Sequence, residues 1–362
     1  MNRPPRPDPR AWTVDVLSRP DDVAAIVDDW DSLARAGAGA PFTLPVVALA
    51  WWEHLGRGRL RVTTVRDGDG RLRAVAPLHA RRLGPGWALR WLGTGLGSVC
   101  EVVGADEAAA AAVWSTLRAG RDVLDLYEYP VGGTGYSALA PAAARAVHRR
   151  PMESCPVIEL DGLDSLDTLL AGRKNLRKTL ARADRAVEAT GEPFEVEAVT
   201  DEGRLAEVLP EIETVFDTAE AARPRQHLLR SPWRDFTVAA LHAAARRGQL
   251  AVFIARLGDR PVACDIDFVV GRRLGVWYGR FDPSVAELSP GHLLLRRQVR
   301  WALEHRLGIV DLLVGEHEYK MRWATGTYPT VHVVGGSRLA LALGRPALEL
   351  RHRLHHALRP TT

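Results

Sequence analysis

The feature that most constrains the fold is a pattern that occurs twice, about 190 residues apart. Each copy has an apolar segment, a turn containing Gly and Asp, and a second apolar segment, at 60–78 and again at 250–268. Such a pattern is typical of a β-hairpin. Each hairpin follows a segment with helical character, at 45–55 and 232–247. We interpret the pattern as two copies of one α/β unit; chance similarity of two short hairpins is the alternative.

Strand and helix patterns also alternate through the rest of both halves. Long helices are expected at 164–190 and 291–306, and a strand at 309–314. The sequence therefore predicts an α/β fold of two tandem domains, each with a mixed central sheet flanked by helices, and a helical tail. The expected domains are residues 1–162, a scaffold or acceptor domain, 163–337, which carries the donor site, and 338–362, the tail.

Composition indicates a soluble globular protein, with 46% hydrophobic and 25% charged residues. Of the 48 basic Lys and Arg residues only three are lysines, which is typical of a GC-rich, bacterial genome. The pI of about 9.2 is then weak evidence for nucleic acid, and no DNA partner is expected. The three cysteines are widely separated, which favours a reducing cytoplasm, and no apolar run approaches the roughly 20 residues of a membrane span.

The two hairpins differ in their second strands. Where the first copy has Val75 and Pro77, the second has Asp265 and Asp267. Alternation along a strand places both carboxylates on one face. They are candidates to bind an acceptor amine, or to act as base if mutual repulsion raises one pKa. The alternative is an exposed strand face. The polar pair predicts that the second copy holds the site.

Three motifs in the second half carry a resemblance to a known family. They are Trp277-Tyr278-Gly279-Arg280-Phe281-Asp282, Ser289-Pro290-Gly291-His292-Leu293-Leu294, and the run from Asp311 to Lys320 with Gly315-Glu316 inside it. In this order they resemble the CelD/BcsL-type acetyltransferases of the GNAT superfamily. They are also similar to the Fem-type peptidyl transferases, which share the tandem-GNAT architecture.

The resemblance implies an N-acyltransferase that takes acyl-CoA, such as acetyl-CoA, as co-substrate and has no permanently bound cofactor. Its acceptor would be an amine of a small molecule or of an envelope or natural-product pathway. It also implies three groups of site residues. The catalytic group is Lys320, Glu316, Tyr319, Asp265 and Asp267; the donor-binding group is Tyr278, Ser289, Gly291, His292 and Leu293; the substrate-binding group is Lys174, Arg177, Lys178, Trp277, Arg280, Arg322 and Trp323.

The chain departs from ordinary GNAT enzymes at the phosphate loop. Those enzymes hold the CoA pyrophosphate on an R/Q-x-x-G-x-G/A loop whose backbone N–H groups face the phosphates. Here only Gly291 is present, preceded by Ser289 and Pro290, which suit the start of a helix. The alternative function is therefore a Fem-type transferase that uses aminoacyl-tRNA. A non-catalytic protein that kept the fold is a third possibility.

Each candidate has a chemical reason and an ordinary alternative. Lys320 or Tyr319 would stabilise the oxyanion or protonate the leaving group; otherwise Tyr319 packs and Lys320 pairs with Glu316. Glu316 would accept the proton of the attacking amine, while His317 is interpreted as a surface residue. The basic run from Arg173 to Arg185 suits a phosphate-containing ligand or tRNA; otherwise it is a solvated face. The tail histidines lack metal-site spacing, so no metal is expected.

Overall fold

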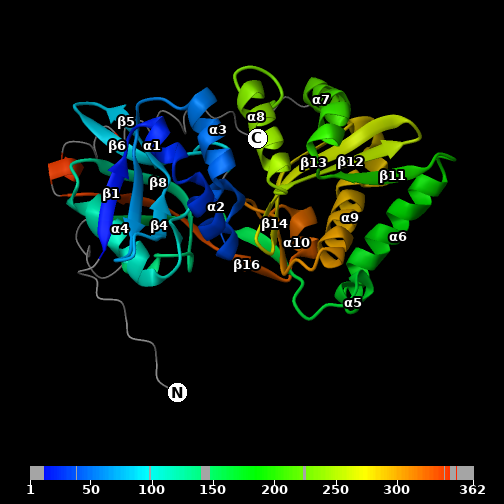
Figure 1. Cartoon of the computed structure of the whole chain (residues 1–362). Coiled ribbons are helices and arrows are strands. Elements are labelled where there is room, and N and C mark those ends of the chain that lie inside the picture. The colour runs from blue at the N-terminus through cyan, green and yellow to red at the C-terminus, as the bar shows by residue number, and fades with distance from the viewer. Residues whose placement is uncertain are drawn as a thin grey trace. The chain divides into compact units, whose positions relative to one another are not determined.

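The structure is a computed structural model that describes residues 12–37, 39–97, 99–139, 147–222, 226–337, 339–342 and 348. The chain divides into two compact units (Figure 1). The second unit comprises Leu49–Leu55 and Glu153–Tyr328, and the first comprises the remainder. Compactness does not establish independent folding, so the domain boundaries at 162 and 337 stay a prediction.

The first unit contains two sheets. A four-stranded sheet has the order β1-β3-β4-β7, and a six-stranded sheet has the order β2-β5-β6-β8-β17-β9. Strands β6 and β8 are parallel, with helix α4 between them in sequence. The strands are β1 (Thr13–Leu17), β2 (Arg59–Leu60), β3 (Val62–Arg66), β4 (Leu72–Ala76), β5 (Leu78–Leu83), β6 (Gly86–Trp91), β7 (Val103–Gly104), β8 (Val123–Pro130), β9 (Val147–Pro151) and β17 (Thr330–Gly335). The helices are α1 (Pro20–Ala24), α2 (Val27–Ala36), α3 (Pro45–Leu55, shared with the second unit) and α4 (Glu107–Ala119), with short 3-10 turns η2 (Pro41–Thr43) and η3 (Ser137–Leu139).

The second unit is built on one seven-stranded sheet of order β11-β12-β13-β14-β15-β10-β16. Helices α7 and α8 lie on one side of this sheet and α9 on the other (Figure 1). The strands are β10 (Cys155–Glu159), β11 (Phe194–Val199), β12 (Leu250–Leu257), β13 (Arg260–Val270), β14 (Arg273–Phe281), β15 (Ile309–Asp311) and β16 (Gly326–Tyr328). The helices are α5 (Leu166–Leu170), α6 (Lys174–Glu188), α7 (Glu202–Ala222), α8 (Arg234–Arg246), α9 (Pro290–Glu304) and α10 (Glu318–Trp323), with the 3-10 turn η4 (Pro283–Leu288).

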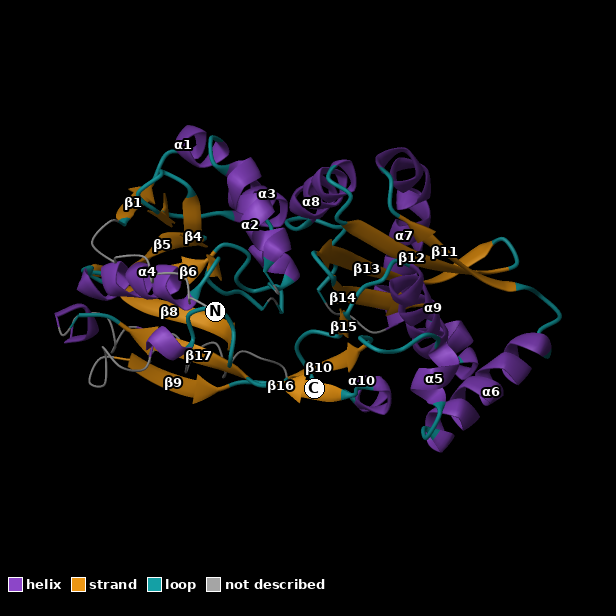
Figure 2. Ribbon diagram, turned by 60° about the horizontal axis from the view of Figure 1, so that its bottom comes forward, coloured by secondary structure: helices purple, strands orange, loops and turns teal. Residues whose placement is uncertain are grey.

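The two units repeat one order of elements, and the predicted α/β class with mixed sheets flanked by helices is confirmed. In each, three antiparallel strands (β1, β3, β4 or β11, β12, β13) precede a parallel pair that encloses a helix in sequence. In each, a strand from elsewhere in the chain then joins the second parallel strand, β17 beside β8 and β10 beside β15 (Figure 2). The first copy is interrupted at Pro77, where β4 ends before β5 begins in the other sheet, whereas β13 is continuous.

Strand pairing corrects the alignment of the two hairpins by one residue. Thr63 faces Ala76, whereas Phe253, 190 residues further on, faces Asp265. The turn between β3 and β4 is longer than the turn between β12 and β13, which shifts the second strand. The residues that correspond to Asp265 and Asp267 are therefore Ala76 and Leu78, and both are buried and apolar.

Two predicted elements are shorter in the structure because the backbone turns inside them. The helix expected at 164–190 is divided into α5 and α6 at Gly172, whose φ of 62° is a left-handed conformation that glycine adopts without strain. The strand expected at 309–314 ends at Asp311, because Leu313 has a φ of 53°. The predicted helical tail from 338 falls largely outside the described residues.

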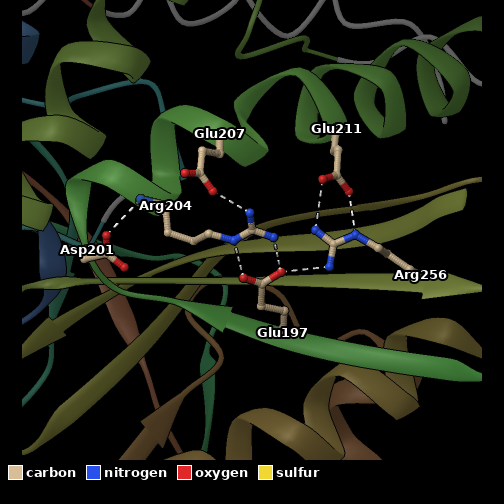
Figure 3. A network of polar contacts seen from close by, with 6 residues as sticks. All are labelled: Glu197, Asp201, Arg204, Glu207, Glu211 and Arg256. Atoms are coloured by element: carbon tan, nitrogen blue, oxygen red, sulfur yellow. Dashed lines mark hydrogen bonds and ion pairs between the residues drawn. The ribbon is translucent and has the colours of Figure 1, made fainter. Parts of the chain in front are cut away.

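A network of charged side chains attaches α7 to strands β11 and β12 of the seven-stranded sheet (Figure 3). Arg204 of α7 donates to Glu197 of β11 at 2.6 Å and to Glu207 at 2.6 Å. Arg256 of β12 donates to the same Glu197 at 2.8 Å and to Glu211 of α7 at 2.6 Å. The network fixes the helix on that face. Within the described residues, no helix is both long and apolar enough to cross a bilayer.

Candidate functional site

The site begins where two parallel strands separate. Strands β14 and β15 pair only from Arg273 to Gly275 and from Ile309 to Asp311. Beyond these residues β14 continues to Phe281, while the chain after β15 turns away at Leu313. An opening between parallel strands, near their carboxyl ends, is where α/β proteins place ligands.

Two carboxylates lie on β13 beside this opening, on the side of the sheet that α9 covers. Gln298 of α9 donates its amide N–H groups to Asp265 at 3.0 Å and to Asp267 at 2.8 Å. Asp267 is fully buried and Asp265 is half-buried. One oxygen of Asp267 and the amide oxygen of Gln298 have no hydrogen-bond partner among the described residues. The predicted pair is thus brought together, with one amide between the two groups.

Burial makes both carboxyl groups harder to ionise. It raises the pKa of Asp265 to about 7, an effect that Gln298, Lys320 and Arg280 oppose. The pKa of Asp267 is also raised, by burial first and by the charge of Asp265 second. Repulsion therefore contributes, as expected, but loss of water is the larger cause. At neutral pH the arrangement favours a proton on Asp267 and an available carboxylate on Asp265.

Gly279 of β14 makes room for the Asp265 carboxylate. The two residues face each other in the antiparallel pair. A Cβ atom on residue 279 would lie 1.8 Å from Oδ1 of Asp265, which no side chain tolerates. The motif glycine therefore allows the carboxylate to fold over the neighbouring strand. The sequence offered no indication of this role, because it depends on the strand register.

Lys320 is a buried cation that the backbone after β15 holds in place. Its ammonium donates to the carbonyl oxygens of Leu312 at 2.7 Å and Val314 at 2.9 Å, and its side chain is 9% exposed. Burial lowers its pKa, while nearby acidic groups, Asp311 and Asp265 among them, oppose that shift. Two of the three ammonium N–H groups are used among the described residues. The ordinary alternative, an ion pair with Glu316, is not formed; α10 begins only at Glu318.

A β-bulge turns Trp277 and Tyr278 to the opposite side of the sheet. Ile266 faces Tyr278 and Asp267 faces Val276, so Trp277 is the extra residue. Trp277 contacts Phe236 of α8, and Tyr278 stacks on Phe216 of α7. The Tyr278 hydroxyl donates to the carbonyl of Gln226. These two candidates are therefore separated by the sheet from Asp265 and α9.

Arg280 is also committed to the α7 side. Its guanidinium donates to Glu220 of α7 at 2.8 Å and to the carbonyl of Gln226 at 3.2 Å, and it contacts the Tyr278 hydroxyl. Both charged side chains of the Arg280–Glu220 pair are about one-tenth exposed. A buried ion pair of this kind fixes the last turn of α7 against β14. The substrate-binding role predicted for Arg280 remains a prediction.

The first turn of α9 carries the four other donor-binding candidates. Ser289 precedes the helix with a φ of 54° and does not cap it with its side chain. Gly291 has open space where a Cβ would lie, and Leu293 is buried in the core. His292 is half-buried and accepts a hydrogen bond at Nδ1 from the indole N–H of Trp323, at 2.9 Å. Trp323 itself is fully buried.

The remaining candidates on and before α10 are exposed. Glu316 lies in the loop before the helix, and Tyr319 is 42% exposed with its ring nearly perpendicular to that of His292. Arg322 pairs with Glu318 at 2.5 Å and donates to Thr179 of α6 at 3.2 Å. No contact joins Glu316 to the Asp265 cluster among the described residues. Glu316 is therefore less well placed as a base than Asp265.

Helix α6 presents a row of cations. Leu176, Leu180 and Ala183 face the core. Arg173, just before the helix, donates to the carbonyls of Trp323 at 3.0 Å and Ala324 at 3.1 Å, at the end of α10. The exposed cations without an ion pair among the described residues are Lys174, Arg177, Lys178, Arg182 and Arg185. We call these five residues the α6 basic face.

Three contributors were absent from the sequence interpretation: Gln298, Arg273 and Tyr328. Gln298 lies in an amphipathic helix and gave no signal, although its amide connects both carboxylates. Arg273 donates to Asp311 at 2.5 Å, and the Tyr328 hydroxyl donates to Asp311 at 2.8 Å. Asp311, a motif residue, is thus held at the base of the opening by these two side chains and by the backbone N–H of Leu313 at 2.9 Å. Among the described residues, no cluster of three or more His, Cys, Asp or Glu has the geometry of a metal site.

Comparison with known proteins bears on fold and domain. Residues 174–321, less than half of the chain, match the sequence model of an acetyltransferase (GNAT) domain. No curated protein matches the chain in sequence. Among solved structures, FemX has a TM-score of 0.62 at 13% identity, covering 90% of this chain and 98% of its own.

Two further structures share the fold. A C-terminal domain assigned to a lysylphosphatidylglycerol synthetase from Agrobacterium fabrum has a TM-score of 0.60 at 14% identity, covering 92% of this chain and 96% of its own. L-PGS from Bacillus licheniformis has a TM-score of 0.54 at 10% identity, covering 94% of this chain and 97% of its own. At these identities the likeness concerns the fold alone. The fold is that of two tandem GNAT-like units, and the domain match supports an acyltransferase of the GNAT superfamily.

Proposed function

We propose that the chain is a CelD/BcsL-type N-acyltransferase that transfers an acyl group from acyl-CoA to an amine. The acceptor amine would belong to a small molecule or to an envelope or natural-product precursor. The observation that carries the proposal is the half-buried Asp265, whose pKa is raised to about 7, beside the separated strands β14 and β15. We also propose a cytoplasmic location, which suits three cysteines that are all buried free thiols.

In this mechanism Asp265 acts as the base. An amine is protonated at neutral pH and attacks only after it loses a proton. Asp265 would accept that proton, directly or through water. The nitrogen then attacks the thioester carbonyl and a C–N bond forms. The nitrogen releases its second excess proton to water, and the C–S bond breaks. The proton taken up by Asp265 leaves with the sulfur as free CoA thiol, delivered by the Asp265 carboxyl directly or through Tyr319.

Lys320 would stabilise the negative charge of the tetrahedral intermediate. Its ammonium is held by the carbonyls of Leu312 and Val314 and keeps a third N–H for the developing oxyanion. A positioned cation in a site with little water is effective because it needs no reorganisation during the reaction. Glu316 and Asp267 remain the other carboxylates proposed for the proton transfer.

The first experiment identifies the donor. Thermal unfolding is measured with CoA and a panel of acyl-CoAs, and a donor at about 100 times its Kd should add about 2.7 kcal/mol, a shift of a few degrees. Release of free CoA is then followed with a panel of amines. We expect Lys320→Gln to keep the donor-induced shift and to lower turnover about a hundredfold. Full turnover in a folded Lys320→Gln protein would contradict the mechanism.

A second candidate function is favoured by the α6 basic face. A Fem-type transferase would receive its acyl group from aminoacyl-tRNA, and exposed cations without ion pairs suit a phosphate backbone. The test is binding of aminoacyl-tRNA at several salt concentrations. If three of these cations contact phosphates, Lys174→Ala, Arg177→Ala and Lys178→Ala together should reduce the salt slope by about 3. Stabilisation by an acyl-CoA and none by tRNA would exclude this candidate.

A further inference from the structure

The hydrogen bond between Trp323 and His292 determines where the imidazole carries its proton. The indole N–H donates to Nδ1 of His292 at 2.9 Å. An indole nitrogen can only donate, so Nδ1 must supply a lone pair. The ring is then neutral, and its single proton is on Nε2. Protonation of Nδ1 would bring two N–H groups face to face and break this hydrogen bond.

The surroundings of the ring also disfavour a positive charge. Burial lowers the pKa of His292, and the guanidinium of Arg322 lowers it further. Around the imidazole lie Trp323, stacked on it at 6.4 Å between ring centres, and Tyr319, edge-on at 6.4 Å, with His317 stacked beyond Tyr319. Among the described residues, Arg322 is the charged group that acts on this imidazole, and the ion-pair partner of Arg322 is the exposed Glu318 at 2.5 Å.

The Nε2–H group faces outward. No described residue accepts a hydrogen bond from this group. The Nε2 atom is also not enclosed by protein, so it is exposed to solvent. It lies in the first turn of α9, next to Gly291, around which there is open space. The same helix carries Gln298, which holds Asp265 and Asp267. A neutral donor is thus presented at the end of α9 that the sequence assigned to the acyl donor.

We infer that Trp323 is a positioning residue that holds His292 as a neutral Nε2–H donor to a phosphate oxygen of the acyl donor. The inference rests on the proposed acyl-CoA-dependent function and deepens it. This chain lacks the glycines that bring backbone N–H groups close to the pyrophosphate in ordinary GNAT loops. A side-chain N–H fixed by a buried indole supplies such a donor without close backbone approach.

A second histidine at the other end of α9 is a matched internal control. His305 has its Nδ1 2.8 Å from the carbonyl oxygen of Trp301. A carbonyl only accepts, so Nδ1 of His305 carries a proton. Long-range 1H–15N NMR spectra distinguish protonated from unprotonated ring nitrogens. We expect His292 and His305 to show opposite states at Nδ1 at pH 7. A protonated Nδ1 on His292 would overturn the role of Trp323.

Binding of CoA tests the other half of the inference. Titration calorimetry with CoA, and with pantetheine as a probe without phosphates, compares the wild-type protein with His292→Phe. A hydrogen bond to a charged group corresponds to about a ten- to hundredfold change in affinity. We expect that loss for CoA and no change for pantetheine, while His305→Gln keeps the wild-type affinity. Equal losses for both probes would overturn the phosphate contact.

Trp323→Phe separates positioning from simple packing. Without the indole N–H, Nδ1 is free to take a proton, so the pKa of His292 should rise. The CoA phosphate itself titrates at about pH 6 in both proteins. Relative to the wild type, affinity of the variant for CoA should then become tighter from pH 8 to pH 6. If Trp323→Phe does not fold, the NMR and His292→Phe measurements still decide. No CoA binding by the wild type would overturn the acyl-CoA donor together with this role; unaltered binding by His292→Phe overturns the role alone.

Discussion

The two units contain the same buried ion pair but different hairpins. In the first unit Arg90 of β6 donates to Asp125 of β8 at 2.7 Å, and in the second Arg273 of β14 donates to Asp311 of β15 at 2.5 Å. Each pair joins the two parallel strands of its unit. A feature that both copies share belongs to the architecture. Asp311 is therefore explained as a structural residue, although it lies in a motif.

The two hairpins, by contrast, differ in their buried carboxyl groups. Asp125 is fully buried but has two strong partners, since His332 also lies 2.9 Å from its second oxygen. Asp265 and Asp267 share one neutral amide, and their counterparts in the first unit are Ala76 and Leu78. A buried carboxyl group without a paired cation lowers stability, and such groups are concentrated at functional sites. Among the described residues, two buried carboxyl groups that share one amide occur in the second unit, which supports the proposal that this unit carries the reaction.

The largest expected effect comes from the carboxylate that is fully paired. Asp125→Ala leaves Arg90 buried without its partner, and breaking a buried ion pair costs about 3–5 kcal/mol. Urea unfolding should show this loss, while turnover per folded molecule stays unchanged. Asp122→Ala, which removes a longer 3.5 Å pair with Arg61 in the same unit, should cost less than about 1 kcal/mol. Equal costs for the two variants would contradict the distinction.

Asp265→Asn should reverse this pattern. Loss of a general base lowers turnover about a hundredfold or more. Stability should not fall, because the asparagine is neutral. The pKa of Asp265 is about 7 in the folded state and about 4 in the unfolded state. Between these pH values the folded protein keeps a proton that the unfolded chain has released, so the stability of the wild type declines as pH rises through this range. The variant should lack that part of the decline, measured by unfolding at several pH values. An unchanged rate would remove Asp265 from the mechanism.

A smaller effect is expected from the strand beside Asp265. The added methyl group of Gly279→Ala would meet the carboxylate, at 1.8 Å from Oδ1 if nothing moved, and displace it from Gln298. Turnover should fall about tenfold, by imperfect alignment of the base. Gly203→Ala in α7 is the control, since its Cβ would have only an ordinary contact at 3.5 Å with Asp201. Similar rates for both variants would show that the carboxylate position is unimportant.

The smallest effect concerns the network in Figure 3. The Arg204 and Arg256 hydrogen bonds lower the pKa of Glu197 to about 2, with burial opposing. Because the pKa of Glu197 is lower in the folded state, this carboxylate stabilises the folded protein at pH values above the unfolded pKa near 4.5. That contribution to stability is lost as pH falls towards 2. Because the side chains are partly exposed, Glu197→Gln should cost no more than about 1 kcal/mol at pH 7. The difference from wild type should disappear in acid, and a constant difference would refute the ionic explanation.

Much of this organisation was predictable from sequence. The repeated hairpins at 60–78 and 250–268 and the helix that begins near Gly291 follow from periodicity and capping residues, which are local. The pairing of Asp265 with Asp267 on one face followed from alternation. Gln298, Gly279 and the carbonyl partners of Lys320 did not, because they depend on register and on contacts between distant segments. The bulge at Trp277, which leaves Trp277 and Tyr278 both on the side of the sheet that α7 and α8 cover, also depends on register.

The central claim is that Asp265 is an unpaired carboxylate that ionises near neutral pH, and it is tested without any substrate. Protein labelled with 13C at the aspartate carboxyls is titrated by NMR, and Asp265→Asn identifies the signal of Asp265. We predict one signal that titrates near pH 7 and is absent from Asp265→Asn. If all aspartate signals of the folded protein titrate below about pH 5, Asp265 is an ordinary carboxylate and the account is contradicted.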